Sequence, residues 1–291
     1  MFANRGYLLD VRRRTPRRRT LAEIVDILAR YRYTEFRPYS ADGFEGVEID
    51  FARLDAYCAM QGIRMVRTTP ADCERMLLGG ETVFASVETE SSLAGRVEDM
   101  REGMERAEAS GRARGASGFL VTDFSDACAW QPLAASLPGI VMGANFATSG
   151  RKATHMDLER ELDAVLGAPV GGLLLRLGTL YLRGGAVRAH CSELHNILSH
   201  DHGYSRHPGL TDAILEEISG IAHGVAIAAE RWTDRCDWAA EIVHMANLVD
   251  CACHRRDETR LRKLRDEHGR VWRARSEESQ RIESLSRLPR F

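Results

Sequence analysis

Long apolar runs, paired cysteines and lysine are all scarce in this sequence of 291 residues. No stretch approaches the roughly 18 consecutive apolar residues that a membrane helix needs. Residues 1–10 also lack the apolar core and small-residue cleavage site of a signal peptide. The 7 cysteines are odd in number and show no CxxC spacing, which argues against a disulfide framework and a zinc ribbon. We therefore expect a cytoplasmic protein without membrane contact.

Lysine occurs only at Lys152 and Lys263 among 40 basic residues. The 42 acidic residues balance these, and a net charge of −2 gives no overall field that would attract nucleic acid. Glycine-rich phosphate loops are missing too, because the glycine pairs at residues 79–80 and 171–172 lack the GxGxxG or GxxxxGK spacing. The sequence thus predicts no nucleic-acid partner and no cofactor.

Strand and helix signals alternate through the first half of the chain, within an ordinary globular composition of 44% apolar and 28% charged residues. Thr20 and Glu23 have the spacing of a capping box and predict a helix over residues 20–31. The other expected helices cover residues 50–61, 71–78 and 93–112, and the expected strands cover residues 6–11, 33–39, 63–66, 82–87 and 118–124. Such βα repeats predict a parallel sheet covered by helices.

The strand signals stop after Pro138. Apolar residues then recur at spacings of three and four, which predicts amphipathic helices over residues 210–225, 238–249 and 261–272. We expect a β/α domain over residues 1–150 and an all-helical domain over residues 151–291. The segment 200–208 is expected to be a loop, and the last ten residues are expected to be frayed.

Polar residues follow the predicted strands at the edge where parallel sheets carry their chemistry. They are Asp10, Tyr39, Thr68, Glu88, Asp123 and Asp126. The acids among them favour a polar ligand site. The alternative, that one or two of them only cap the helices that follow, stays open.

Two segments carry a resemblance to a known family. Arg5-Gly-Tyr-Leu-Leu-Asp10 and Phe36-Arg-Pro-Tyr39 resemble the opening of the barrel in glycoside hydrolase family 20, the β-N-acetylhexosaminidases. Val121-Thr-Asp-Phe-Ser-Asp-Ala-Cys-Ala-Trp-Gln-Pro-Leu133 is similar to the last-strand segment of a bacterial branch of that family. Shorter similarities occur at residues 54–63, 91–95, 136–139 and 267–275.

The resemblance implies a truncated or distorted TIM-barrel-like sheet of about five βα units that binds a sugar or a small polar metabolite. Its motifs place the ligand against Arg5, Asp10, Tyr39, Trp130 and Gln131. If the protein is an enzyme, acid/base chemistry would have to come from Asp123, Asp126 and Glu88.

Departures from the family pattern put its standard mechanism in doubt. The chain passes from the third strand directly to the equivalent of the seventh, so it lacks the Asp-Glu pair that ends the fourth strand and serves the substrate-assisted reaction. The pairs Asp257-Glu258 and Asp266-Glu267 lie in a predicted helix instead. Phe124 also stands where the branch has tryptophan, and Ala129 where it has histidine. We expect the hexosaminidase mechanism to be absent.

A shortened sheet leaves exposed edges, which invite pairing or must be covered, and this predicts a homodimer. Two other functions stay open, a non-catalytic scaffold or sensor and a metal-dependent enzyme using His200 and His202. His190 and His195 are five residues apart and would lie on different faces of a helix, which argues against a shared metal.

Two further motifs have competing interpretations. The six arginines between Arg12 and Arg19 are expected to form a solvated loop, with contact to an anionic ligand as the alternative. Cys128 could be a nucleophile, but without a placed histidine base it is more simply a small residue.

Overall fold

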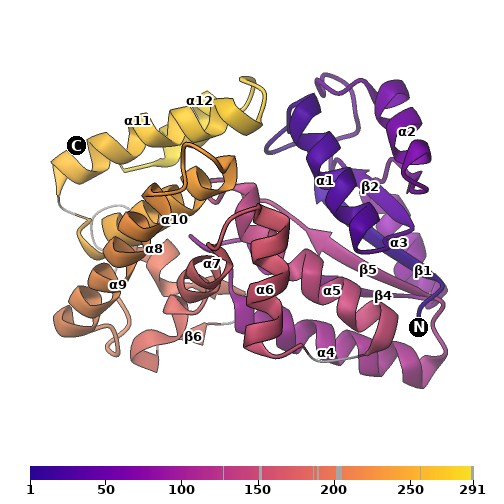
Figure 1. Ribbon diagram of the computed structural model, residues 1–291, viewed down its shortest axis with the longest axis horizontal. Coiled ribbons are helices and arrows are strands. Elements are labelled where there is room, and N and C mark those ends of the chain that lie inside the picture. Colours follow the sequence, from indigo (N-terminus) through magenta and orange to yellow (C-terminus); the bar gives the residue numbers. More distant parts are fainter. Residues whose placement is uncertain are drawn as a thin grey trace.

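The chain folds into a mixed α/β protein in which a five-stranded parallel sheet is covered by helices (Figure 1). The structure is a computed structural model that describes residues 1–126, 128–150, 153–185, 187–188, 190–200, 205–255 and 257–289. Five strands were predicted, and five form the sheet. A second, two-stranded ladder occurs later in the chain.

The main sheet has the strand order β3-β2-β1-β5-β4, with all neighbours parallel. Its strands are β1 (Asn4–Asp10), β2 (Glu35–Tyr39), β3 (Arg64–Met65), β4 (Thr82–Ser86) and β5 (Gly118–Asp123). Within the described residues β3 and β4 do not pair with each other, so the sheet is open. The predicted parallel sheet is confirmed.

Helices connect the strands: α1 (Arg18–Arg30), α2 (Phe51–Met60), α3 (Pro70–Gly79) and α4 (Val97–Arg114). Three connections move in the same direction across the sheet: β1 to β2, β2 to β3, and β4 to β5. Because such connections are right-handed, the helices within them, α1, α2 and α4, lie on one face of the sheet. Tyr7, Leu9 and Val121 belong to the hydrophobic core on that face. Their neighbours Leu8 and Leu120 point to the other face, because side chains alternate along a strand.

The start of α1 differs from the prediction. The N-cap is Arg17, which makes no side-chain cap, and Thr20 lies within the helix. The Thr20 hydroxyl donates to the Arg275 carbonyl at 2.8 Å instead of capping. The capping-box prediction is therefore wrong, because the Thr20 hydroxyl makes a tertiary hydrogen bond and does not cap the helix. A capping box does form at α3, between Thr69 and Asp72.

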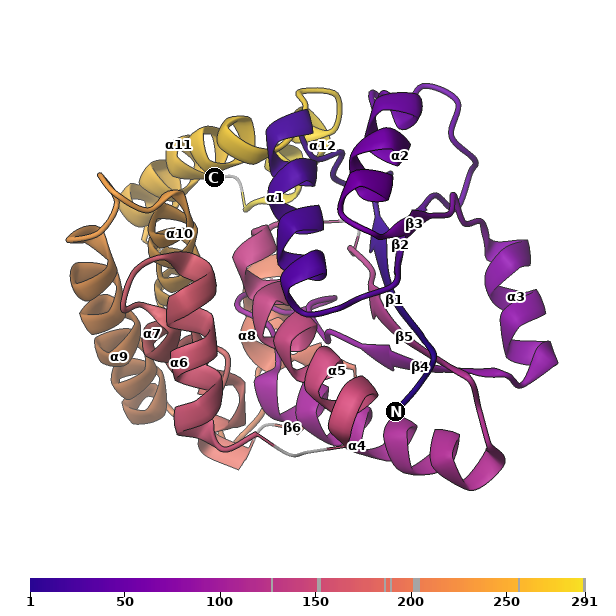
Figure 2. The ribbon, with the colours of Figure 1, turned by 45° about the vertical axis from the view of Figure 1, so that its right-hand side comes forward.

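The second half is mainly helical (Figure 2). Its elements are α5 (Leu137–Ser149), α6 (His155–Leu166), α7 (Gly171–Leu177), α8 (Glu193–Ser199), α9 (Asp212–Glu230), α10 (Asp237–Cys253), α11 (Glu258–Arg275) and α12 (Arg281–Arg287), with 3-10 turns at Leu133–Ser136 and Leu180–Gly185. It is not all-helical, because β6 (Val187–Arg188) and β7 (Cys191–Ser192) form an antiparallel ladder. Residues 282–287, part of the segment that was expected to be frayed, belong to α12.

A buried charge network joins the helical half to the sheet. The Arg275 guanidinium pairs with Glu241 at 2.6 Å and with Glu23, and it stacks on Trp238 at 3.9 Å. Glu241 also accepts a hydrogen bond from the Ala134 amide at 2.9 Å. One hydrophobic cluster runs through both halves, and these charge contacts link α10 and α11 to α1 and to the 3-10 turn that precedes α5.

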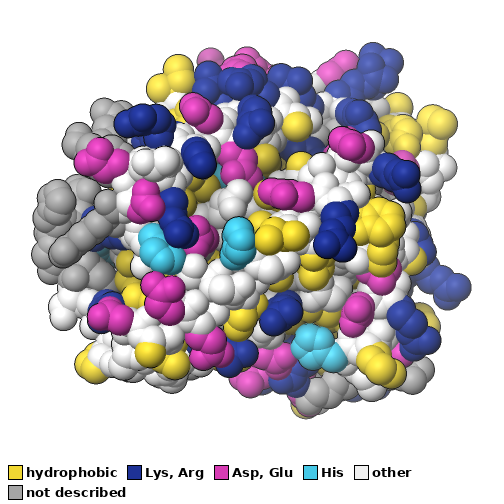
Figure 3. Space-filling model, turned by 60° about the vertical axis from the view of Figure 1, so that its left-hand side comes forward, with side chains coloured by type: hydrophobic (Ala, Val, Ile, Leu, Met, Phe, Trp, Pro, Cys, Tyr) yellow, Lys and Arg dark blue, Asp and Glu magenta, His cyan; other side chains and the backbone are white. Residues whose placement is uncertain are grey.

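Over the described ranges, no single helix has both the length and the apolar character needed to cross a membrane. In the searched part of the chain one bent pair, His155–Leu166 with Gly171–Gly185 at 118°, passes that test by length and composition. Figure 3 views the side of the molecule that carries the helical half, and acidic and basic side chains are interspersed over it.

Candidate functional site

The strand register determines which polar side chains meet at the carboxyl edge of the sheet. Asp10 lies directly opposite Tyr39, and Leu9 lies opposite Asp123. Since side chains alternate, Asp10 and Tyr39 share the face away from the helices, whereas Tyr7 and Asp123 share the helix-covered face. The predicted site residues on these strands therefore divide between two faces.

Asp10, Tyr39 and Phe124, which we call the edge platform, lie on the face away from the helices. The Tyr39 and Phe124 rings pack edge to face with centroids 5.1 Å apart, and both rings are half-buried. The Asp10 carboxylate accepts a hydrogen bond from the Arg12 amide at 2.9 Å. Burial raises the pKa of Asp10, although the backbone amides of the following arginines lower it in part. The platform combines partly exposed aromatic surface with a carboxyl group.

Asp123 lies on the helix-covered face and is 4% exposed. It accepts hydrogen bonds from the Tyr7 hydroxyl at 2.5 Å and the Thr89 hydroxyl at 3.1 Å. Burial raises the pKa of Asp123, and the hydrogen bonds from Ser136, Tyr7 and Thr89 offset only part of that effect. Both carboxyl oxygens thus have partners within the fold.

A small polar cavity of about 10 Å³ separates Asp10 and Asp123. Arg14 and Gln131 also line it, and the Arg14 guanidinium donates to the Gln131 carbonyl at 2.8 Å. The Gln131 side-chain oxygen is buried without a hydrogen-bond partner in the described part of the chain. Since a water molecule needs roughly 10–15 Å³ of such space, the cavity has the size for one water and not for a sugar.

Asp126 forms a second cluster with Cys128 and His195. His195 Nε2 lies 3.2 Å from Asp126 Oδ2, and one ligand atom of each of the three residues lies within 4.8 Å of the others. Burial raises the pKa of Asp126, but the adjoining His195 ring and the amides of Ala129 and Ser91 outweigh it, so the pKa falls below its ordinary value. Burial raises the pKa of Cys128 to about 12, which opposes a free thiolate nucleophile.

Three predicted site residues lie away from the edge platform. Arg5 is at the opposite, amino-terminal end of β1, where its guanidinium donates to the Arg32 and Phe2 carbonyls at 2.8 Å. Glu88 pairs with the buried Arg96 beside α4. Trp130 is fully buried, and its indole N–H donates to the Ser284 carbonyl at 3.2 Å. None of the three presents a free side chain to a ligand on the platform.

The histidine and arginine predictions also change. His200 is exposed and its Nδ1 lies 2.9 Å from the Asn196 carbonyl, while His202 lies outside the described residues. His195, which the sequence weighed only as a partner of His190, lies beside Asp126 instead. Arg14 is 4% exposed and stacks on Trp272 at 4.8 Å, so the arginine run is not wholly solvated.

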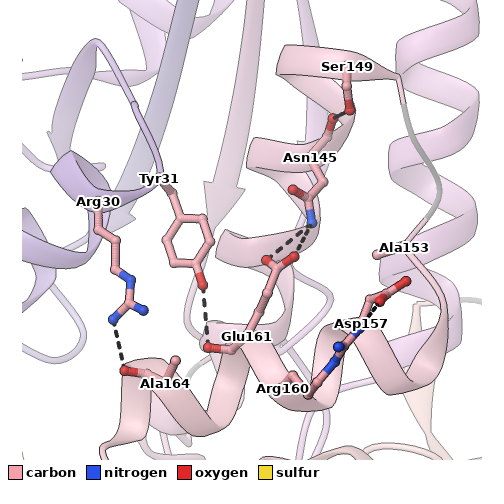
Figure 4. A pocket seen from close by; sticks show the side chains of 9 residues that line it. All are labelled: Arg30, Tyr31, Asn145, Ser149, Ala153, Asp157, Arg160, Glu161 and Ala164. Carbon is pink, nitrogen blue, oxygen red and sulfur yellow. Dashed lines mark hydrogen bonds and ion pairs between the residues drawn. The ribbon is translucent and has the colours of Figure 1, made fainter.

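Larger hollows lie elsewhere on the described surface. Figure 4 shows one of about 510 Å³ between α1, α5 and α6. Its polar groups bind one another, as where Arg30 donates to the Ala164 carbonyl at 2.8 Å and Asn145 donates to Glu161 at 3.4 Å. Because these partners are internal, the hollow offers little unsatisfied chemistry to a ligand.

The sequence matches no model of a protein family and no curated protein.

Proposed function

We propose that the chain is a shortened hexosaminidase-like protein that binds a sugar or a similar small polar metabolite at its edge platform. The observation that carries the proposal is the meeting of Asp10, Tyr39 and Phe124 on one face at the carboxyl edge. Aromatic rings stack on the apolar face of a sugar, and a carboxylate accepts hydrogen bonds from its hydroxyls. In open and closed α/β folds, this edge is where ligands bind.

The strand order supports the shortening. In an eight-stranded barrel the last strand closes against the first, and the strand before it lies next in line. Here β5 pairs with β1, and β4 pairs with β5. That order fits a barrel from which the fourth to sixth strands have been removed. A doubly wound sheet would instead reverse direction at β1 and place helices on both faces.

The acids available at the edge do not suit hexosaminidase chemistry. Asp257 caps α11, and Glu258, Asp266 and Glu267 lie within that helix, away from any strand end. Asp123 and Asp126 are held by hydrogen bonds and charge contacts within the fold. The proposed function is therefore binding, or a reaction other than substrate-assisted hydrolysis.

A calorimetric titration with N-acetylglucosamine and N-acetylgalactosamine tests the proposal. Binding is expected in the intact chain and should weaken about twofold to tenfold in Tyr39→Ala and Phe124→Ala, since an aromatic contact contributes roughly 0.5–1.5 kcal/mol. Tyr57→Ala on α2 is the matched control, because the hydroxyl of that ring donates to Asp26 of α1 at 2.7 Å. Binding that is equal in all four proteins would overturn the proposal.

A second candidate is an interaction protein that acts as a homodimer. The outer strands β3 and β4 have open edges, and the helices beside them expose Met60, Leu77 and Leu78, while α3 buries none of its side chains. A second copy would cover this apolar surface. Light scattering should then give twice the monomer mass of 32.5 kDa at micromolar concentration, and Leu78→Glu should reduce it. A monomer in both cases would contradict the dimer.

A further inference from the structure

Three side chains of the types that ligate metals meet beyond the carboxyl end of β5. Asp126 and Cys128 follow β5 on one loop, and His195 reaches them from α8. A carboxylate oxygen, the thiol sulfur and a ring nitrogen all lie within 4.8 Å of one another. Because the loop and the helix are far apart in the sequence, the tertiary fold brings these groups together.

The His195 ring is the group that points to a ligand. The residue is only 6% exposed, and neither ring nitrogen has a hydrogen-bond partner within the described ranges. Its Nε2 lies 3.2 Å from Asp126 Oδ2, and this contact contributes to the lowered pKa of Asp126. Buried polar atoms without partners are rare and need an explanation such as a bound water or ion. An ion that takes a lone pair of this ring would supply one.

The Asp126 carboxylate is held in position by backbone groups. Its Oδ1 accepts hydrogen bonds from the Cys128 and Ala129 amides at 2.8 Å, and its Oδ2 accepts one from the Ser91 amide at 2.8 Å. The backbone of Ala129 and Ser91 has positive φ angles of 48° and 51°, which turn these amides toward the carboxylate. Such outer contacts are typical of metal ligands, because they orient the donor atoms.

We propose that Asp126, Cys128 and His195 bind one Zn²⁺ ion. A thiolate, an imidazole and a carboxylate are each common zinc ligands, and their mixture suits this borderline cation better than Mg²⁺ or Ca²⁺, which prefer oxygen alone. Binding replaces the thiol proton of Cys128, which is released to solvent, and needs neutral His195. Three protein ligands leave a fourth position for water or another small ligand.

The required movement is small. In a tetrahedral site with bonds of about 2.0–2.3 Å, ligand atoms are roughly 3.3–3.8 Å apart. The present separations of up to 4.8 Å therefore need to contract by about 1 Å. The fully buried Trp130 ring, whose centroid is 5.4 Å from that of His195, forms an apolar wall behind the cluster.

Metal titration of the full chain, stripped with a chelator and reduced, tests the inference without any sugar. We expect one equivalent of Zn²⁺ by calorimetry. Co²⁺ should give the visible bands of a tetrahedral ion and a sulfur-to-cobalt charge-transfer band. His195→Ala and Asp126→Asn should weaken Zn²⁺ binding at least 100-fold, and Cys128→Ser should abolish the sulfur band. Cys191→Ser, a cysteine on the neighbouring β7, is the matched control and should bind like the parent protein.

The spectra keep the test independent of folding defects. Cys128→Ser changes one atom, and its circular dichroism identifies a variant that has not folded. A parent protein that binds no Zn²⁺ would overturn the inference. Binding that survives Cys128→Ser and His195→Ala but is lost in His200→Ala would overturn it too, because the ion would then lie at the 200–208 segment. Neither result would touch the sugar proposal, which uses different side chains.

Discussion

Buried His268 should make the stability of this protein fall in mild acid. His268 lies in α11 and is 1% exposed. Its Nδ1 is 3.0 Å from His244 Nε2, and its Nε2 is 3.0 Å from the Ser284 hydroxyl. Burial, followed by the nearby His244 and by Arg14, Arg265 and Arg281, lowers the pKa of His268 well below its ordinary value. The ring is therefore neutral in the folded protein.

The size of the effect follows from proton linkage. Histidine in an unfolded chain has a pKa of about 6.5, so below that pH the unfolded chain binds a proton at residue 268. Folded His268 stays neutral there, and the free energy of unfolding therefore falls as the pH falls. One such group contributes up to about 1.4 kcal/mol per pH unit, or about 2 kcal/mol between pH 6.5 and 5.0. His268→Gln should lose about 1–3 kcal/mol at pH 7.5 through its altered hydrogen bonds, but it should lack this acid-dependent loss.

Urea unfolding at pH 7.5, 6.5, 5.5 and 5.0, followed by tryptophan fluorescence and circular dichroism, measures both quantities. The stability gap between the parent protein and His268→Gln should narrow by about 2 kcal/mol toward pH 5.0. His223, which is exposed, supplies the control. The difference in unfolding free energy between the parent protein and His223→Gln should stay constant over this pH range. A constant gap for His268→Gln would refute the argument that this ring is held neutral by burial.

Three further substitutions test the account. Asp123→Asn should gain stability relative to the parent as the pH rises above about 4, because the raised pKa of Asp123 makes the folded carboxyl harder to ionise. Thermal unfolding from pH 4 to 7 measures the difference in stability between the two proteins. A difference that does not change with pH would contradict the prediction. Glu241→Ala should lower the free energy of unfolding in urea by about 3–5 kcal/mol, because it leaves Arg275 buried without its main partner. Glu102→Ala, which removes one member of an exposed pair, should lower it by less than about 1 kcal/mol. Similar losses in the two variants would contradict the larger contribution of the buried pair. Gly143→Ala should lower the free energy of unfolding by about 1–3 kcal/mol, because the new Cβ would lie 2.3 Å from a Val121 methyl. Gly220→Ala, on the open surface of a helix, should raise it. No change in Gly143→Ala would mean that α5 packs less closely on β5.

The sheet was predictable because its signals are local. Short apolar strands alternated with helices, and that pattern by itself implies parallel pairing. The order β3-β2-β1-β5-β4 was not predictable from local signals, because it depends on where the chain returns after α3. The β6–β7 ladder was also missed, since two strands of two residues leave no periodicity to detect.

The candidate site was predictable only in part. Parallel strands bring Asp10, Tyr39 and Asp123 to one edge, so their positions in the strands were sufficient. Asp126 lies on a loop and His195 on a helix far away in the sequence. The spacing of histidines along a helix cannot predict such a contact. Arg14 looked like one charge in a solvated run, but the fold buries it against the ring of Trp272.

The central claim is that the edge platform binds a sugar and that the hexosaminidase reaction is lost. Saturation-transfer NMR with the 4-nitrophenyl glycoside of N-acetyl-β-glucosamine, followed over hours, tests both parts in one sample. The account predicts transfer to the sugar protons, loss of that transfer in Phe124→Ala, and an intact glycoside at the end. Release of 4-nitrophenol that Asp123→Asn abolishes would contradict the lost chemistry, and an absence of transfer would contradict the binding site.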